Sequence, residues 1–186
     1  MKILTILIAL LPLTTFCQEI EHICPPNTEL KVDTFPEYTV YQCIANDVQE
    51  GTSKAYNNEG ILKFENHWKK GKAVGIWKEW DKEGNLWSTT VYENGAKNGL
   101  EIFYYNNGNK KVETTFKNGI KHGVINQWNE FEVHLVTGNF KMGLEDGLWF
   151  IRKNKTKIVA TQFQKGKQLF EQEQDWTDKD LPKVIY

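Results

Sequence analysis

The residue types that most often carry catalysis or bind metal are sparse in this sequence. The histidines are His22, His67, His122 and His134. A zinc site needs three or four ligands that converge on one point. Relative to a 24-residue repeat in the chain, the last three histidines occupy three different positions, and His22 lies outside the repeat. We therefore expect surface or turn histidines that bind no metal, and we expect no cofactor.

Two further kinds of catalytic site were considered. The sequence has no H-E-x-x-H, G-x-S-x-G or phosphate-binding Gly-Lys-Ser/Thr motif. Glu145 and Asp146 could act as an acid and base pair or bind calcium. A working carboxylate pair needs two environments that separate the pKa values of its members, and adjacent residues of an exposed turn seldom provide them. The sequence therefore predicts a protein that is not an enzyme.

The cysteines predict one disulfide bond. Cys24 and Cys43 are the only thiols after Cys17, and two cysteines of an exported chain commonly pair. A zinc site would need more ligands at regular spacing, and no C-x-x-C redox motif is present. We expect a bond between Cys24 and Cys43 that stabilises a short N-terminal segment.

Residues 1–17 have the pattern of a signal peptide. Lys2 supplies the positive end, and an apolar run from Ile3 to Leu13 follows it. The run is well short of the ~20 residues that a membrane-spanning helix needs, and no later segment is apolar enough to span a membrane. We expect a mature chain that begins at Gln18 and is periplasmic or secreted. The alternative is a lipoprotein acylated at Cys17, although the bulky Phe16 disfavours that cleavage.

Composition excludes some classes of partner. The chain has 186 residues, of which 40% are hydrophobic and 25% charged, as in a folded soluble protein. Its 23 basic and 24 acidic residues give a formal net charge of -1. Such a chain has no basic field that would attract nucleic acid or anionic lipid. We expect no nucleic-acid partner.

Glycines define a repeat that must position any functional residue. One set recurs every 24 residues, a second set lies four residues before its last four members, and a third lies nine residues after its first three. The sets are Gly51, Gly75, Gly99, Gly123 and Gly147; Gly71, Gly95, Gly119 and Gly143; and Gly60, Gly84 and Gly108. Three columns in register indicate a repeat array. The array comprises five units over residues 51–167.

Each unit is predicted to form two strands joined by turns. Asn94–Gly95, Asn107–Gly108 and Asn118–Gly119 are strong signals for tight turns, and apolar residues alternate between them. We expect an all-β fold: an elongated array of antiparallel β-hairpins in a single meandering sheet of about ten strands. Parity of position places two aromatic rows on one face. The rows are Tyr56, Trp80, Tyr104 and Trp128, and Trp68, Tyr92, Phe116 and Phe140.

The opposite parity carries the candidate binding residues. Trp77, Trp87, Phe103 and Trp149 share this parity with polar residues. Large aromatic side chains on a face that should meet water indicate a contact surface. The alternative is that the capping segments or coiling of the sheet cover both faces and that these residues are core.

The run Gly-Ile-Trp-Lys-Glu-Trp-Asp-Lys-Glu-Gly-Asn-Leu from Gly75, followed by Tyr92 to Gly99, resembles the bacterial variant of the MORN repeat. This variant is found in proteins labelled YwqK-family antitoxins. The resemblance covers about residues 51–167. It implies an elongated β-sheet scaffold that binds proteins, sometimes lipids, and it offers no catalytic residues to carry over.

These observations predict four segments and a non-catalytic function. The segments are a signal peptide (1–17), an N-terminal cap with the disulfide (18–50), five 24-residue units (51–167) and a C-terminal cap (168–186). We expect an exported protein-interaction scaffold with an unidentified protein partner. The alternative is a glycan-binding or cell-wall-binding module, in which exposed tryptophans stack on sugar rings.

Overall fold

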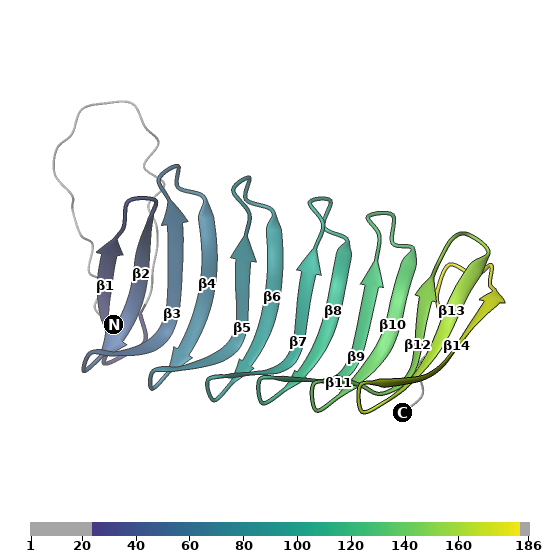
Figure 1. Ribbon diagram of the computed structural model, residues 1–186. Helices are drawn as coiled ribbons and strands as arrows, with labels where there is room; N and C mark the ends of the chain where they lie inside the picture. Colours follow the sequence, from purple (N-terminus) through teal and green to yellow (C-terminus); the bar gives the residue numbers. More distant parts are fainter. Residues whose placement is uncertain (1–23, 183–186) are drawn as a thin grey trace.

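The computed structural model describes residues 24–182, and in this range the chain is entirely β. Fourteen strands form one open antiparallel sheet in which each strand pairs with the next along the chain, apart from the short β11, which pairs only with β10. Figure 1 shows an elongated row of hairpins with β1 at one end and β14 at the other. The predicted all-β array of antiparallel hairpins is confirmed.

The strands are β1 (Glu29–Thr34), β2 (Tyr38–Ala45), β3 (Val48–Asn57), β4 (Leu62–Lys69), β5 (Lys72–Trp80), β6 (Leu86–Glu93), β7 (Ala96–Tyr104), β8 (Lys110–Lys117), β9 (Ile120–Trp128), β10 (His134–Lys141), β11 (Leu144–Glu145), β12 (Gly147–Arg152), β13 (Lys157–Gln164) and β14 (Lys167–Asp175). The strands outnumber the predicted ten because β1, β2 and β14 extend the sheet beyond the repeats and because β11 and β12 are separate.

One kind of turn, drawn at the lower edge of Figure 1, connects each unit to the next. At Asn94–Gly95 both residues have positive φ, 52° and 91°, which is the geometry of a type I′ hairpin turn. The Gly95 N–H donates to the Ala73 carbonyl, 2.9 Å away in the preceding turn region. Equivalent bonds link Gly71 to Gln49, Gly119 to Lys97 and Gly143 to Lys121. The second glycine column therefore ties each hairpin to the one before it.

The turns at the upper edge of Figure 1 join the two strands within a unit. In the turn at 81–85 the Asp81 carboxylate accepts hydrogen bonds from the backbone N–H groups of Glu83 and Asn85 at 3.0 and 2.8 Å. Asn57 and Asn129 hold their own turns in the same way. Such side chains mimic a backbone turn, so one residue fixes the reversal of the chain in each of these three units.

The hairpins bend at the leading glycines, which are the set that recurs every 24 residues from Gly51 to Gly147. Between β4 and β5, Glu65 pairs with Lys78 and His67 pairs with Val74, so one residue of β4 lies opposite three residues of β5. Gly75, with φ of 70°, lies in this excess. The same excess recurs around each of the next two leading glycines. The strands curve at their lower ends in Figure 1, because extra residues in one strand of a pair bend it.

A second bulge, near the upper turns, determines which side chains share a face. Trp80 pairs with Leu86, but Glu79 pairs with Ser88, so Trp87 is an extra residue. One extra residue moves all following side chains to the other face. Between Ser88 and Tyr92, β6 therefore faces the opposite way from the prediction by parity.

The prediction that both aromatic rows share one face was wrong for this reason. We call face A the face that carries Trp68, Tyr92, Phe116 and Phe140, and face B the face that carries Tyr56, Trp80, Tyr104 and Trp128. On face A, Trp77 pairs with Thr90 and Phe103 pairs with Ser88. On face B, Trp80 pairs with Leu86. The two predicted rows thus lie on opposite sides of the sheet.

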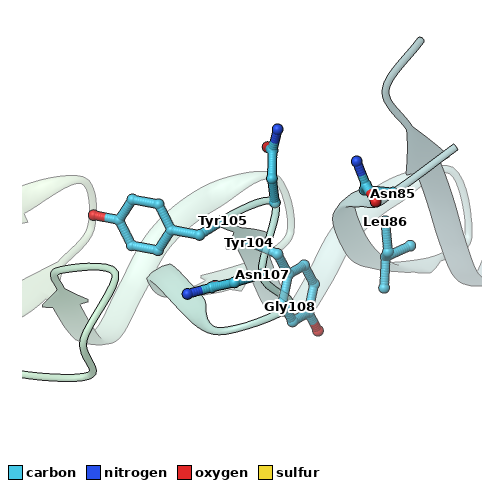
Figure 2. Close-up of a pocket in the computed structure, with 7 residues that line it drawn as sticks. Asn85, Leu86, Tyr104, Tyr105, Asn107 and Gly108 are labelled. Atoms are coloured by element: carbon cyan, nitrogen blue, oxygen red, sulfur yellow. The ribbon is translucent and has the colours of Figure 1, made fainter. Parts of the chain in front are cut away.

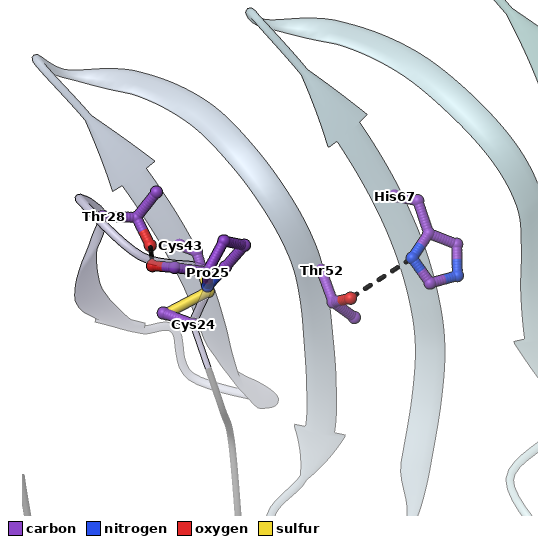
Figure 3. The surroundings of a disulfide bond; sticks show 6 residues. All are labelled: Cys24, Pro25, Thr28, Cys43, Thr52 and His67. Carbon is purple, nitrogen blue, oxygen red and sulfur yellow. Dashed lines mark hydrogen bonds between the residues drawn. A yellow bond between two sulfur atoms is a disulfide. The ribbon is translucent and has the colours of Figure 1, made fainter. Parts of the chain in front are cut away.

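The predicted disulfide joins Cys24 to Cys43 at the N-terminal end of the array (Figure 3). It holds the segment before β1 against β2, and Cys43 is buried. Strands β1 and β2 lie within the segment predicted to be the N-terminal cap, 18–50. Residues 1–17, the predicted signal peptide with Cys17, lie outside the described residues.

At the other end, the segment after β14 folds back over face B. Leu181 is buried with Phe150, Ile158 and Ala160, and Trp176 packs against this cluster. The Arg152 guanidinium donates to the carbonyls of residues 178 and 179 at 2.6 and 2.9 Å. This cluster is one of two buried apolar clusters in the described part of the chain, and both lie near the C-terminal end.

Candidate functional site

A row of aromatic rings runs along face A near the bend of the hairpins. The Trp77 ring centroid lies 4.8 Å from that of Trp68 and 4.4 Å from that of Tyr92. The Trp77 indole N–H donates to the His67 carbonyl at 3.1 Å. Trp77 is therefore held in the row by contacts to both neighbouring strands.

The same arrangement recurs near the C-terminal end. Trp149 is only 8% exposed, and its ring contacts those of Phe140 and Phe163 at 5.1 and 6.0 Å. Its indole N–H donates to the Asn139 carbonyl at 3.2 Å. Trp149 thus occupies the position in its unit that Trp77 occupies three units earlier.

Lysine side chains continue the row where the first ring of a unit is missing. Lys97 Nζ lies 5.3 Å from the centroid of the Phe116 ring, and Lys121 Nζ lies 4.9 Å from that of Phe140. Both distances are within the range of a cation–π interaction. The row on face A is therefore an extended structural seam.

Of the four residues predicted to form a binding surface, two belong to this seam. Trp77 and Trp149 were predicted to point away from the aromatic row of Tyr92 and Phe140, and the structure places them in ring contact with it. The parity argument failed here because the bulge at Trp87 exchanges the faces of β6, and a bulge between His134 and Val136 does the same in β10. Trp149 is buried, as it would be in a core, whereas Trp77 is only partly buried.

The other two predicted residues, Trp87 and Phe103, form an exposed group. Their ring centroids lie 5.8 Å apart in an edge-to-face arrangement. Trp87 is 41% exposed and is the only one of the seven tryptophans in the exposed class. Because Trp87 is the extra residue of a bulge, it has no paired neighbour across the strand to cover it.

Lys111 and Tyr105 complete this group. Lys111 Nζ lies 5.9 Å from the Trp87 ring centroid and 5.5 Å from that of Tyr105. Lys111 is the bulge residue of the next hairpin, one unit after Trp87. The Tyr105 hydroxyl donates to the Trp128 carbonyl at 2.9 Å, which fixes its ring. We call Trp87, Phe103, Tyr105 and Lys111 the Trp87 cluster.

Sequence reasoning found Trp87 and Phe103 but missed the other two members. Neither Lys111 nor Tyr105 was predicted to belong to the binding surface. The signal was available in the spacing, since Lys111 lies 24 residues after Trp87. What could not be read from the sequence is that both positions are bulges that point to face A.

Face B carries the other aromatic row, whose members do not form a continuous seam. The Trp128 ring stacks on His134 with centroids 5.1 Å apart, and the Tyr104 hydroxyl lies 3.4 Å from that of Thr89. Burial, with the Glu65 carboxylate nearby, raises the pKa of Tyr56. These residues contact different partners in each unit, unlike the rings of face A.

His134 lies half-buried in a network of hydrogen bonds. Its Nε2 lies 3.2 Å from Asn126 Oδ1, and its Nδ1 accepts from the backbone N–H of Leu181 at 3.4 Å. Burial lowers the pKa of His134. The prediction of a surface or turn histidine was therefore wrong at this position. Within residues 24–182, no three histidine, cysteine or acidic side chains come together as a metal site would require.

Comparison with known families identifies two of the hairpins. Residues 73–94 and 97–118 match the family described as the MORN repeat variant. These segments cover most of β5–β6 and β7–β8, and all four members of the Trp87 cluster lie within them. The single sheet of consecutive hairpins is consistent with an array of such repeats. No curated protein matches the chain.

Proposed function

We propose that this chain is an exported, non-catalytic scaffold that binds a protein partner on face A, with the Trp87 cluster at the centre of the contact. Repeats of the MORN type generally mediate binding, and a repeated β-sheet is suited to a binding module. The observation that carries the proposal is the exposure of Trp87 beside Phe103 and Lys111. The other two tryptophans of the predicted surface, Trp77 and Trp149, are packed within the seam.

The chemistry of the cluster fits a protein contact. Tryptophan and tyrosine are enriched among the residues that contribute most to protein–protein binding, and a lysine between two aromatic rings offers a cation that a partner carboxylate can approach. The Tyr105 ring is fixed by its hydroxyl bond, so little side-chain freedom is lost when a partner covers it. A rigid, partly apolar centre with one positive charge would prefer an acidic or aromatic patch on the partner.

Two observations support the exported location. The Cys24–Cys43 disulfide is a feature of proteins from oxidising compartments, and the sequence before it has the pattern of a signal peptide. Within the described residues, no helix is long and apolar enough to cross a membrane. Mass spectrometry of material recovered outside the cytoplasm should give a chain that begins at Gln18. A full-length chain confined to the cytoplasm would contradict export.

The binding surface can be tested by site-directed crosslinking. We expect a photoreactive residue at position 87 to capture a protein from the envelope of the producing cell, and the same residue at Ile76 to capture none. Ile76 is a matched control because it is equally exposed but lies on face B. Trp87→Ala combined with Lys111→Ala should weaken binding of the captured protein by at least about tenfold, as expected when a central aromatic contact is lost.

The same experiment separates the two functions that the sequence allows. A sugar adduct at position 87, together with a saturable change in Trp87 fluorescence on addition of cell-wall fragments, would favour the glycan-binding alternative. Equal capture of proteins from positions 87 and 76 would show that face A has no special role and would contradict the proposed surface.

A further inference from the structure

Adjacent upper turns of the array are joined by side chains at most junctions. The Asn58 amide donates to the Pro36 carbonyl in the turn before it at 2.9 Å. The Ile61 side chain lies against Gly84, whose Cβ position would be 3.4 Å from Ile61 Cγ2. The amides of Asn107 and Asn109 both donate to the Glu130 carbonyl in the following turn, at 2.9 and 3.0 Å.

The junction between turns 81–85 and 105–109 lacks such a link in the described structure. Asn85 occupies the position that Ile61 and Asn109 occupy in the neighbouring units. Its amide donates back to Asp81 Oδ2 at 3.0 Å instead of reaching the next turn. The third unit has Tyr105 in place of Asp81, so Asn109 has no carboxylate to bind and reaches forward. The Asp81–Asn85 bond therefore leaves this junction open.

An open hollow of about 280 Å³ lies at this junction (Figure 2). It is lined by the apolar and aromatic residues Leu86, Tyr104 and Tyr105 and by Asn85, Asn106, Asn107 and Gly108, of which the Asn107 amide is already bonded to the Glu130 carbonyl. A Cβ at Gly108 would meet nothing within 4 Å. Figure 2 shows Tyr105 pointing away from Leu86, so the hollow is bounded on that side by the Tyr104 ring and the backbone of the turn.

We propose that this hollow binds one neutral pyranose ring. Its lining combines an aromatic ring and an aliphatic side chain with amide groups, and none of its side chains is charged. An amide both donates and accepts hydrogen bonds, which suits hydroxyl groups, whereas a sugar ring also has apolar C–H faces that pack on an aromatic ring. Within residues 24–182, the Asn106 amide and the Asn85 amide oxygen make no hydrogen bond, whereas the Asn85 N–H groups bind Asp81, so the first two groups can bind a ligand. The volume of about 280 Å³ is slightly below the ~300–1,000 Å³ found for small-molecule sites, so the hollow has room for a single ring and not for a larger ligand.

The hollow is separate from the surface proposed for protein binding. Leu86 and Tyr104 face side B, whereas the adjacent residues Trp87 and Phe103 face side A. Occupation of the hollow by a sugar therefore leaves the Trp87 cluster accessible. The same two hairpins would present a saccharide on one face and a protein on the other.

Binding can be measured by NMR titration of the folded protein, following the side-chain amide signals of Asn85 and Asn106. The probes are methyl glucoside, N-acetylglucosamine and its β-1,4-linked trimer, with glucuronate and glucosamine as charged analogues. We expect at least one neutral probe to bind with a dissociation constant on the order of millimolar, as befits a small ligand in an open site. Tighter binding of the trimer than of the monomer would indicate a polysaccharide chain as the source, and equal binding would indicate a free sugar.

Asn85→Ile provides the sharpest variant, because isoleucine already stands at the equivalent position one unit earlier and packs against the next turn. We expect it to raise the dissociation constant at least about tenfold while the unfolding transition is unchanged or higher. Asn106→Ala, at an exposed residue, should weaken binding severalfold and serves if Asn85→Ile does not fold. Trp87→Ala should leave sugar binding unchanged, whatever its effect on a protein partner. Absence of binding by every neutral probe at tens of millimolar, stronger binding of a charged analogue, or binding unaffected by both variants would overturn the proposal.

Discussion

Tryptophans of this chain differ in role because of where each lies relative to a bulge. Trp77 and Trp149 follow the bend of a hairpin by two residues, and each indole donates to a carbonyl of the preceding unit. Trp87 is itself the extra residue of a bulge and makes one ring contact, with Phe103. The same residue type therefore stabilises the array at two positions and is exposed at a third. Truncating Trp77 should cost stability, whereas truncating Trp87 should mainly affect binding.

The closest packing in the seam predicts a large effect of a small change. Gly138 has no positive φ, but a Cβ at this position would lie 2.2 Å from the Trp149 ring. We expect Gly138→Ala to lower the free energy of unfolding by about 1–3 kcal/mol, as is typical of an overpacked core. Chemical denaturation followed by circular dichroism would measure it.

A double-mutant cycle provides the control for this prediction. Trp149→Leu removes the ring that the new methyl group would meet, so Gly138→Ala should cost little when it is added to that variant. An equal cost in both backgrounds would show that the effect arises from the backbone at Gly138 rather than from contact with Trp149.

The disulfide predicts a second residue-level effect. Replacing Cys24 and Cys43 by serine opens a loop with a sequence separation of 19. The chain-entropy model gives about 3 kcal/mol for a loop of this size, so we expect the free energy of unfolding to fall by that order. A reducing agent should produce the same change in the native chain and no change in the double variant. Equal stability of the two chains without a reducing agent would contradict this prediction.

At the scale of single elements, the turns could be predicted from sequence and the bulges could not. Asn94–Gly95 requires positive φ at both residues, and this requirement is visible in the residue types. The bulge at Trp87 has no such mark, because tryptophan, lysine and leucine all occupy that position in different units. The one indication was Gly166, which follows Gly143 one residue earlier than the 24-residue interval predicts. Hairpin β12–β13 pairs Ile151 with Val159 and Arg152 with Ile158 without a bulge, so its unit is one residue shorter.

This difference explains why the candidate surface was only partly predicted. Because the bulge was not predicted, parity placed Trp77 on the wrong face relative to the rings that it contacts. It correctly grouped Trp87 with Phe103. Closure of the C-terminal end by Leu181 also depends on tertiary contacts between residues far apart in sequence. Neither feature leaves a periodic signal along the chain.

The C-terminal segment should be released by acid because of His134. An unfolded histidine takes up a proton near pH 6.5, and burial lowers the pKa of His134 in the folded protein, where Asp180 opposes and Arg152 assists the shift. The unfolded state therefore binds more protons as the pH falls below about 6.5, and the stability contributed by neutral His134 is present above that pH and is lost below it. Protonated Nδ1 could no longer accept from Leu181.

We expect the midpoint temperature of unfolding to decrease as the pH is lowered from 7.5 to 5.5. Protease cleavage of residues 176–182 should increase at the lower pH. His134→Gln should flatten this dependence, and His122→Gln should leave it intact. A pH profile that His134→Gln does not alter would assign the titration to another group.

At the scale of the whole molecule, each strand of the array has neighbouring strands only along the row. Every strand pairs with the strand before or after it in the chain, and β1 and β14 leave two open edges. All nine residues of β14 are exposed, and its two apolar residues, Leu169 and Phe170, are followed by the acidic side chains of Glu171, Glu173 and Asp175. Charges on an edge strand limit unwanted pairing with other sheets. The proposed binding surface and the hollow both belong to the central hairpins, away from either edge.

Such an array should respond to damage locally, because the stability of a repeat protein is approximately a sum of unit and nearest-neighbour terms. Gly138→Ala weakens the contact between β10 and β12, and no other pairing crosses from that region to the N-terminal hairpins. We expect native-state hydrogen exchange to show protection reduced roughly tenfold or more in β9–β13, since each ~1.4 kcal/mol is a factor of ten. Strands β2–β4, held at the other end by the disulfide, should change by less than about twofold. A uniform loss of protection along the chain would instead show that the fourteen strands unfold as one cooperative unit, and it would remove the physical basis for treating the central hairpins as an independent binding region.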